Sequence, residues 1–136
     1  MTRSGERMPD TLYDTRFFLA AYAGERGPRL QVKSELQSRK RRYVSAITIH
    51  EVYRISLEGE GRDVAKMRKA SIERDFEIID VDSDIAAESA EIKVSQGRDF
   101  PIADAIISAT AKLRKLVCFT DDSHIKSIAT LKTRWF

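Results

Sequence analysis

Five short apolar runs alternate with longer stretches of helical character along this chain, and that alternation constrains the fold more than any other feature. Strands separated by helices pair in parallel, and the connecting helices then cover both faces of the sheet. We therefore predict an α/β fold, a three-layer α/β/α sandwich with a mainly parallel central sheet. The predicted strands cover residues 11–13, 43–47, 77–81, 116–120 and 133–136.

Capping residues and helix breakers mark the ends of the predicted helices. A break at residues 24–28 separates the first two, Thr48 begins the third, and Ser83 caps the fifth, which Gly97 ends. Pro101 opens the sixth, because proline is tolerated in the first turn of a helix. The predicted helices cover residues 16–23, 29–41, 48 to 59 or 61, 62–75, 83–96 and 101–115, and a last one starts at 121–123.

Length and composition narrow the class of protein. A chain of 136 residues predicts a single domain, residues 11–136, after a flexible leader of residues 1–10. The one cysteine, Cys118, excludes a disulfide framework and a cysteine-built zinc site, and its apolar surroundings predict burial. A charged start and the absence of an apolar run of ~18 residues predict a cytoplasmic protein with no membrane span. The net charge of +3 permits a polyanionic partner without demanding one.

Three acidic residues follow predicted strands. Asp14, Glu51 and Asp122 each come just after one, and the carboxyl ends of parallel strands meet at one edge of the sheet, where ligands bind. Each acid also has a structural interpretation. Asp14 and Asp122 are favoured helix N-caps, and Glu51 completes a capping box with Thr48. Asp121 is expected to be an exposed turn residue. Singly, the acids are explained as well by capping as by function.

Asp104 is harder to explain as a structural residue. It lies near the start of the predicted helix 101–115, which is apolar on most of its surface and is therefore expected to be largely buried. A buried carboxylate costs several kcal/mol unless it is paired, protonated or bound to a cation. With no obvious basic neighbour in the sequence, Asp104 is the residue that points most strongly to a metal ligand.

These segments together resemble a known family. The run Ala-Asp-Ala-Ile-Ile-Ser-Ala-Thr-Ala at 103–111, followed by Leu-Val-Cys-Phe-Thr-Asp-Asp at 116–122, resembles the C-terminal half of a PIN-domain nuclease. More narrowly, it is similar to the VapC toxins of prokaryotic type II toxin–antitoxin systems. Residues 12–15 resemble the opening strand with its first acid, and residues 47–52 resemble the segment of the second acid. The resemblance covers nearly the whole chain from Leu12 onward.

The resemblance implies a site of four catalytic, metal-binding acids: Asp14, Glu51, Asp104 and Asp122. Thr120 matches a threonine that orients the last acid. The implied cofactor is Mg²⁺ or Mn²⁺, which gives an all-carboxylate site the positive charge it needs to bind a phosphodiester and to activate water. We expect Asp14 and Asp104 to be direct ligands, and Glu51 and Asp122 to be water-mediated ligands or to orient the attacking water.

The activity implied by the resemblance is metal-dependent endoribonuclease cleavage of single-stranded RNA by the toxin of a toxin–antitoxin pair. The implied partners are the RNA, a cognate antitoxin and a second copy of the chain in a homodimer. The alternative is a PIN-like RNA-processing domain, or one that binds RNA or protein without acting as a toxin. Occupation of all four acid positions favours the enzyme.

Other motifs are weaker or open. His50 and His124 lack zinc-ligand spacing, and no serine nucleophile elbow, dinucleotide motif, P-loop or receiver-type acid pair is present. A cluster of four basic residues, which we call the basic block, consists of Arg39, Lys40, Arg41 and Arg42. This block either contacts RNA phosphates or forms a solvated helix end.

Two apolar sets provide either a dimer or antitoxin surface, or part of the ordinary core. The first set is Phe17, Phe18, Leu19 and Tyr22, and the second is residues 49–57.

Overall fold

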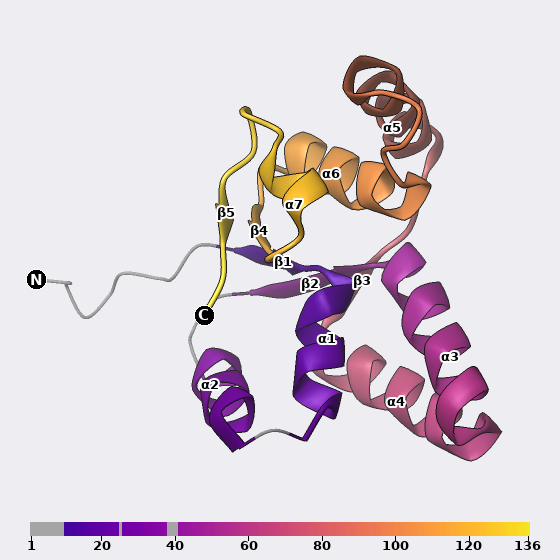
Figure 1. The fold of residues 1–136 in the computed structure, drawn as a ribbon, viewed down its shortest axis with the longest axis vertical. Helices are drawn as coiled ribbons and strands as arrows, with labels where there is room; N and C mark the ends of the chain where they lie inside the picture. The colour runs from indigo at the N-terminus through magenta and orange to yellow at the C-terminus, as the bar shows by residue number, and fades with distance from the viewer. Residues whose placement is uncertain (1–9, 25, 38–40) are drawn as a thin grey trace, which may run out of the picture.

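The computed structural model describes residues 10–24, 26–37 and 41–136, with the side chains of 26–30 left out, and contains a five-stranded parallel sheet in the order β3-β2-β1-β4-β5 (Figure 1). Leu12 in the central strand pairs with Tyr43 on one side and Cys118 on the other. The strands are β1 (Thr11–Tyr13), β2 (Arg42–Ser45), β3 (Glu77–Ile79), β4 (Val117–Phe119) and β5 (Thr133–Arg134). The predicted sheet is confirmed. The predicted leader lies outside the described residues, apart from Asp10.

Helices cover both faces of this sheet, as predicted. Figure 1 shows α5, α6 and α7 over one face and the first four helices over the other. The helices are α1 (Thr15–Tyr22), α2 (Arg26–Leu36), α3 (Ala46–Glu60), α4 (Arg62–Asp75), α5 (Ser83–Gln96), α6 (Ile102–Arg114) and α7 (Ser123–Lys126). Among the described residues, no helix combines the length and apolar character needed to cross a membrane.

Two hydrophobic cores lie on opposite faces of the sheet. Leu12 and Cys118 face the core beneath α5 and α6, while their neighbours Tyr13 and Phe119 face the core beneath α1, α3 and α4. This alternation follows from the strand period of two. Cys118 is fully buried, as predicted. Phe17 and Phe18 are also buried, so core packing explains these two, whereas Ile49, Tyr53 and Leu57 border an open groove on α3.

The structure corrects the predicted N-cap residues of two helices. α3 begins at Ala46, because Ser45 Oγ accepts a hydrogen bond from the Ile47 amide at 3.2 Å and so acts as the N-cap in place of Thr48. α5 does begin at Ser83, but its N-cap is Asp82, which accepts from the Ile85 amide at 2.9 Å. The predicted ends of these helices at glycine hold, since Gly61 and Gly97 have φ of 91° and 111°.

The boundaries of α2 also differ from the prediction. It begins at Arg26, ahead of Pro28, because a proline in the first turn removes no intrahelical hydrogen bond. Its described part ends at Leu36, and Arg39 and Lys40 of the basic block lie outside the described residues. Arg42 lies in β2, where Nη1 donates to the Leu36 carbonyl at 2.8 Å and Nε to the Asp75 carbonyl at 3.3 Å. Arg42 therefore satisfies the last carbonyls of both α2 and α4.

Candidate active site

The site lies at the carboxyl edge of the sheet, between β1 and β4, where the chain connections diverge to the two sides. Asp14 follows β1, and Thr120 follows β4. The Thr120 hydroxyl donates to Asp14 Oδ2 at 2.6 Å, and the Asp14 amide donates to the Phe119 carbonyl at 3.1 Å. Two segments far apart in the sequence are thus joined directly at the edge of the sheet.

Asp14 occupies the N-cap position of α1, but its side chain makes no capping hydrogen bond. The capping interpretation of this carboxylate is therefore wrong. The residue is 2% exposed, and this burial raises its pKa to about 6. The Thr120 hydrogen bond opposes the rise in pKa, while repulsion from Asp122 and Glu51 adds to it. Asp14 is a buried carboxylate with like charges around it.

Glu51 reaches the site from the second turn of α3. Because Ser45 caps this helix, the predicted capping box is wrong, and the Glu51 carboxylate does not bond back to Thr48. Instead Thr15 Oγ1 donates to Glu51 Oε1 at 2.5 Å and lies 3.2 Å from Thr48 Oγ1. Thr15 is a positioning residue that sequence reasoning missed, since nothing in the sequence indicates that α1 and α3 meet here.

Asp104 lies in the first turn of α6, with its side chain 17% exposed. Burial, then repulsion from Asp122, Asp14 and Glu51, raises the pKa of Asp104 to about 7. Within the described residues, neither lysine nor arginine forms an ion pair with it. The sequence prediction of a largely buried carboxylate without a strong cation beside it agrees with this environment.

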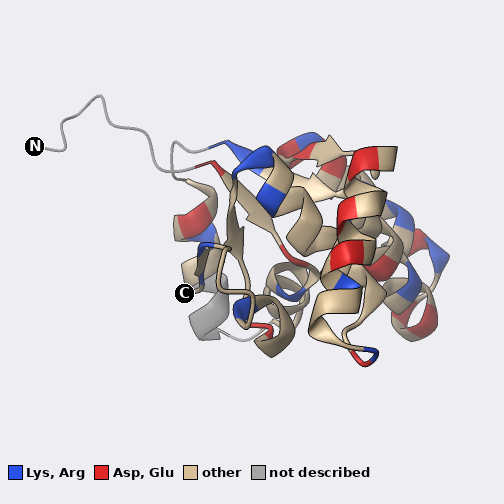
Figure 2. Ribbon diagram, turned by 90° about the horizontal axis from the view of Figure 1, so that it is seen from above, with Lys and Arg blue, Asp and Glu red and all other residues tan. Residues whose placement is uncertain are grey.

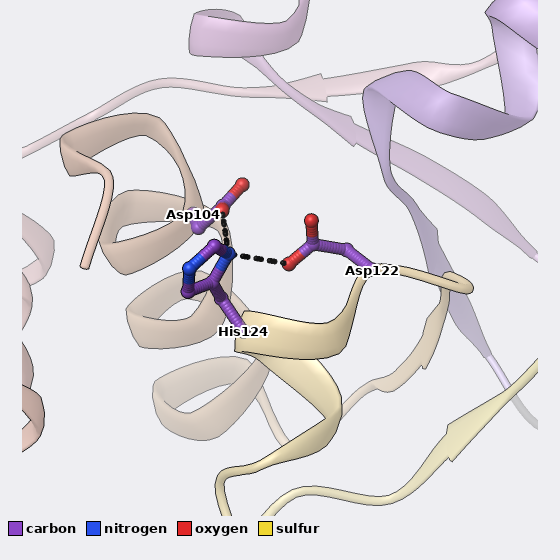
Figure 3. Close-up of side chains that lie close together, drawn as sticks. All are labelled: Asp104, Asp122 and His124. Atoms are coloured by element: carbon purple, nitrogen blue, oxygen red, sulfur yellow. Dashed lines mark ion pairs between the residues drawn. The ribbon is translucent and has the colours of Figure 1, made fainter. Parts of the chain in front are cut away.

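Asp122 both caps α7 and faces Asp104 (Figure 3). Its Oδ2 accepts from the Ile125 amide at 3.0 Å, and its own amide donates to Thr120 Oγ1 at 2.9 Å. The capping and site interpretations of Asp122 are therefore compatible. Asp121 points elsewhere and pairs through both carboxylate oxygens with the Arg16 guanidinium.

His124 also lies at the site, which sequence reasoning missed. Its Nδ1 is 3.6 Å from Asp104 Oδ2 and 3.7 Å from Asp122 Oδ2, as Figure 3 shows. Single donor atoms of Asp104, Asp122 and His124 all lie within 4.8 Å of one another. Asp14 and Glu51 lie outside this group. The only available signal was that His124 comes two residues after Asp122, and its orientation depends on how α7 packs against α6.

The two described residues of the basic block lie away from the acids. Arg41 and Arg42 stand at the start of β2, whereas the acids gather at the carboxyl ends of the parallel strands. Arg42 is held by two carbonyls, and Arg41 is exposed. Basic residues are interspersed with acidic ones on the outer helices (Figure 2). Arg39 and Lys40 lie outside the described residues. Phosphate contacts by this block stay a prediction.

The donor set fits a divalent cation. Burial, together with repulsion from the neighbouring carboxylates of Glu51 and Asp122, raises the pKa values of Asp14 and Asp104. A cation relieves such repulsion, and carboxylate oxygens are the ligands that Mg²⁺ and Mn²⁺ accept. The residues present could therefore hold one such ion, with the imidazole of His124 as an additional nitrogen donor.

Solved structures similar to this chain include a toxin and toxin–antitoxin complexes. FitAcB from Neisseria gonorrhoeae is 27% identical, with a TM-score of 0.71 over 90% of this chain and 95% of that one. DNA-bound VapBC from Salmonella typhimurium is 16% identical, with a TM-score of 0.76 over 94% of this chain and 98% of that one. VapC20 from Mycobacterium tuberculosis, a sarcin-ricin loop cleaving toxin, is 16% identical, with a TM-score of 0.76 over 92% of this chain and 99% of that one.

The two 16% identical structures share the fold with this chain. A comparison with curated proteins finds no match. The PIN domain model matches residues 11–131, which span all the strands but the last and all four site acids. The resemblance inferred from the sequence is thereby confirmed at the level of the family, and this chain belongs to the PIN domain family.

Proposed function

We propose that this protein is a metal-dependent endoribonuclease that cleaves single-stranded RNA and acts as the toxin of a toxin–antitoxin pair. One observation carries the proposal. Four carboxylates from separate parts of the chain converge at the carboxyl edge of the sheet, where burial and mutual repulsion raise the pKa of Asp14 to about 6 and that of Asp104 to about 7. In the absence of a bound cation, such an arrangement destabilises the folded protein. A cation-dependent activity explains why the fold nevertheless brings these carboxylates together.

The side chains divide into ligands and positioning groups. Asp104, Asp122 and Asp14 are the carboxylates we assign to hold a divalent ion. The closeness of Asp122 to Asp104 favours direct contact, in place of the water-mediated role expected from the sequence. Thr120 is a positioning residue, because its hydroxyl donates a hydrogen bond to the Asp14 carboxylate and accepts one from the Asp122 amide. It fixes two acids relative to each other.

Glu51 is assigned a different role. Thr15 holds Glu51 Oε1, which leaves Oε2 to orient the attacking water and accept its proton. When bound, a divalent cation offsets negative charge on the phosphate and acidifies water. The burial of Asp14 limits water around its own carboxylate, which strengthens electrostatic interactions there.

The similar structures support the choice of substrate and partner. VapC20 is described as a sarcin-ricin loop cleaving toxin, VapBC is described as a family of toxin–antitoxin systems, and a similar structure from Klebsiella pneumoniae is a toxin–antitoxin complex. We therefore assign RNA as the substrate and a cognate antitoxin as the partner that restrains the activity. Formation of a homodimer stays a prediction.

Incubation of the purified chain with end-labelled single-stranded RNA tests the activity. We expect cleavage with Mg²⁺ or Mn²⁺, none in excess EDTA, and none by Asp104→Asn. Asp99→Asn, which changes an exposed aspartate just before α6, is the matched control and should cleave like wild type. Cleavage that persists undiminished in EDTA, or in Asp104→Asn, would contradict the metal-dependent mechanism. Metal-dependent binding of RNA without cleavage would favour a binding module.

Induced expression in a bacterial host tests the toxin assignment. We expect growth arrest by wild type, relief of that arrest by coexpression of a cognate antitoxin, and no arrest by Asp104→Asn. Cleavage in the test tube without growth arrest would move the assignment to RNA processing.

A further inference from the structure

The imidazole of His124 is aimed at two carboxylates of the candidate site. Its Nδ1 lies 3.6 Å from Asp104 Oδ2 and 3.7 Å from Asp122 Oδ2 (Figure 3). Both distances exceed that of a hydrogen bond, so neither carboxylate is hydrogen-bonded to this nitrogen. The nitrogen therefore faces the site without a close bond to either acid.

The spacing suits three donors around one ion. Two donors that each lie about 2.1 Å from the same ion are roughly 3–4 Å apart, depending on the angle between them. The two distances from Nδ1 fall in this range, and single donor atoms of Asp104, Asp122 and His124 all lie within 4.8 Å of one another. Little movement is needed to bring the three onto one ion.

Packing holds the imidazole in this orientation. The ring of Phe100 meets the ring of His124 edge-on, with centroids 5.6 Å apart and an interplanar angle of 77°. Phe100 is 4% exposed and belongs to the core beneath α6. His124 is itself half-exposed, but its ring contacts a buried side chain of the core.

We propose that Nδ1 of His124 is a direct ligand of the divalent ion and makes this site select Mn²⁺ over Mg²⁺. This inference rests on the metal site proposed above and adds its selectivity. Imidazole nitrogen binds first-row transition metals well, whereas Mg²⁺ takes oxygen ligands almost exclusively. A site of carboxylates alone discriminates less between the two ions, so the nitrogen is the source of the preference.

Pulsed electron paramagnetic resonance of the Mn²⁺-loaded full-length wild type tests the coordination without any substitution. We expect modulation from a directly bound ¹⁴N nucleus, lost in His124→Ala and His124→Gln. Saturable Mn²⁺ binding with no nitrogen modulation would overturn the role of His124 and leave the carboxylate site standing. No saturable binding of Mn²⁺ would overturn both proposals, so the two failures are distinguishable.

Calorimetric titrations with Mn²⁺ and Mg²⁺ test the selectivity. For both His124 variants we expect the Kd for Mn²⁺ to rise about tenfold or more and that for Mg²⁺ to change less than about threefold. His50→Ala, which removes the other histidine, is the control and should change neither Kd. Tighter binding of both ions by the His124 variants would show that His124 acts as a competing positive charge, and equal weakening of both would also contradict the proposal.

Discussion

Individual carboxylates at the edge of the sheet hold their protons more tightly than aspartates in water. The pKa values of Asp14 and Asp104 are raised from 3.8 to about 6 and about 7. Between roughly pH 4 and pH 7 the folded state therefore binds more protons than the unfolded state. By linkage, these two residues favour folding at low pH, and their contribution is lost as pH rises through the folded pKa values.

Replacement of Asp104 by Asn isolates this effect. In EDTA, we expect Asp104→Asn and wild type to have nearly equal Tm at pH 4. The variant should become the more stable as pH rises past 7, by on the order of 1 kcal/mol after allowance for solvent screening. Melts monitored by circular dichroism across this range, with Asp99→Asn as control, measure the gap. A difference in Tm that does not change with pH would contradict the raised pKa of Asp104.

Thr120 makes a second prediction at the residue scale. Its hydroxyl stabilises the ionised form of Asp14, so Thr120→Val should raise the pKa of Asp14 further and move the acidic limb of the pH–rate profile to higher pH. We expect kcat/KM to fall about tenfold or more. Thr120→Ser keeps the hydroxyl and is the control. Identical profiles for the Val and Ser variants would assign Thr120 to packing alone.

At the scale of a single helix, the N-cap of α5 provides a prediction about stability. Asp82 caps α5, although the neighbouring Ser83 is the cap expected from the sequence. Asp82→Ala should lower the free energy of unfolding by about 1 kcal/mol, and Ser83→Ala should leave it nearly unchanged. Urea unfolding of the two variants measures both values. A larger loss for Ser83→Ala would restore the cap predicted from the sequence.

The elements themselves were largely predictable because their sequences carry clear local signals. α4 has the predicted bounds, α5 and α3 end at glycines with positive φ, and all five strands occur where apolar runs do. The ends were less predictable. Residues 43–47 form one apolar run in the sequence and are predicted to be a single strand. In the structure Ser45 caps α3, so the helix begins earlier than predicted and Glu51 lies one turn further into it. Local sequence did not separate the last strand residue from the cap.

Contacts between distant elements account for what the sequence did not predict. Arg42 satisfies carbonyls of α2 and α4, although it reads as part of a surface block. Thr15 and His124 join the site only because α1 meets α3 and α7 packs beside α6. Asp104, by contrast, was predictable, because a carboxylate in an apolar helix needs an explanation that no local interaction supplies.

At the scale of the whole molecule, parallel pairing is what assembles the site. β1 and β4 are neighbours in the sheet yet lie more than a hundred residues apart in the chain, and the hydrogen bond from Thr120 to Asp14 spans that separation. The fold therefore concentrates negative charge in the folded state alone. An ion that neutralises it should bind the folded state and not the unfolded one, and so should raise the stability of the whole chain.

Thermal melts of the 136-residue chain with and without millimolar Mn²⁺ test whether the carboxylates at the edge of the sheet form a metal site. Near pH 7.5, we expect the ion to raise the Tm of wild type and of Asp99→Asn by roughly 5 °C, as an ion present well above its Kd would. Asp104→Asn should lose most of this gain while being at least as stable as wild type in EDTA. A wild type whose Tm ignores Mn²⁺ and Mg²⁺, or an Asp104→Asn variant that gains as much as wild type, would contradict the site.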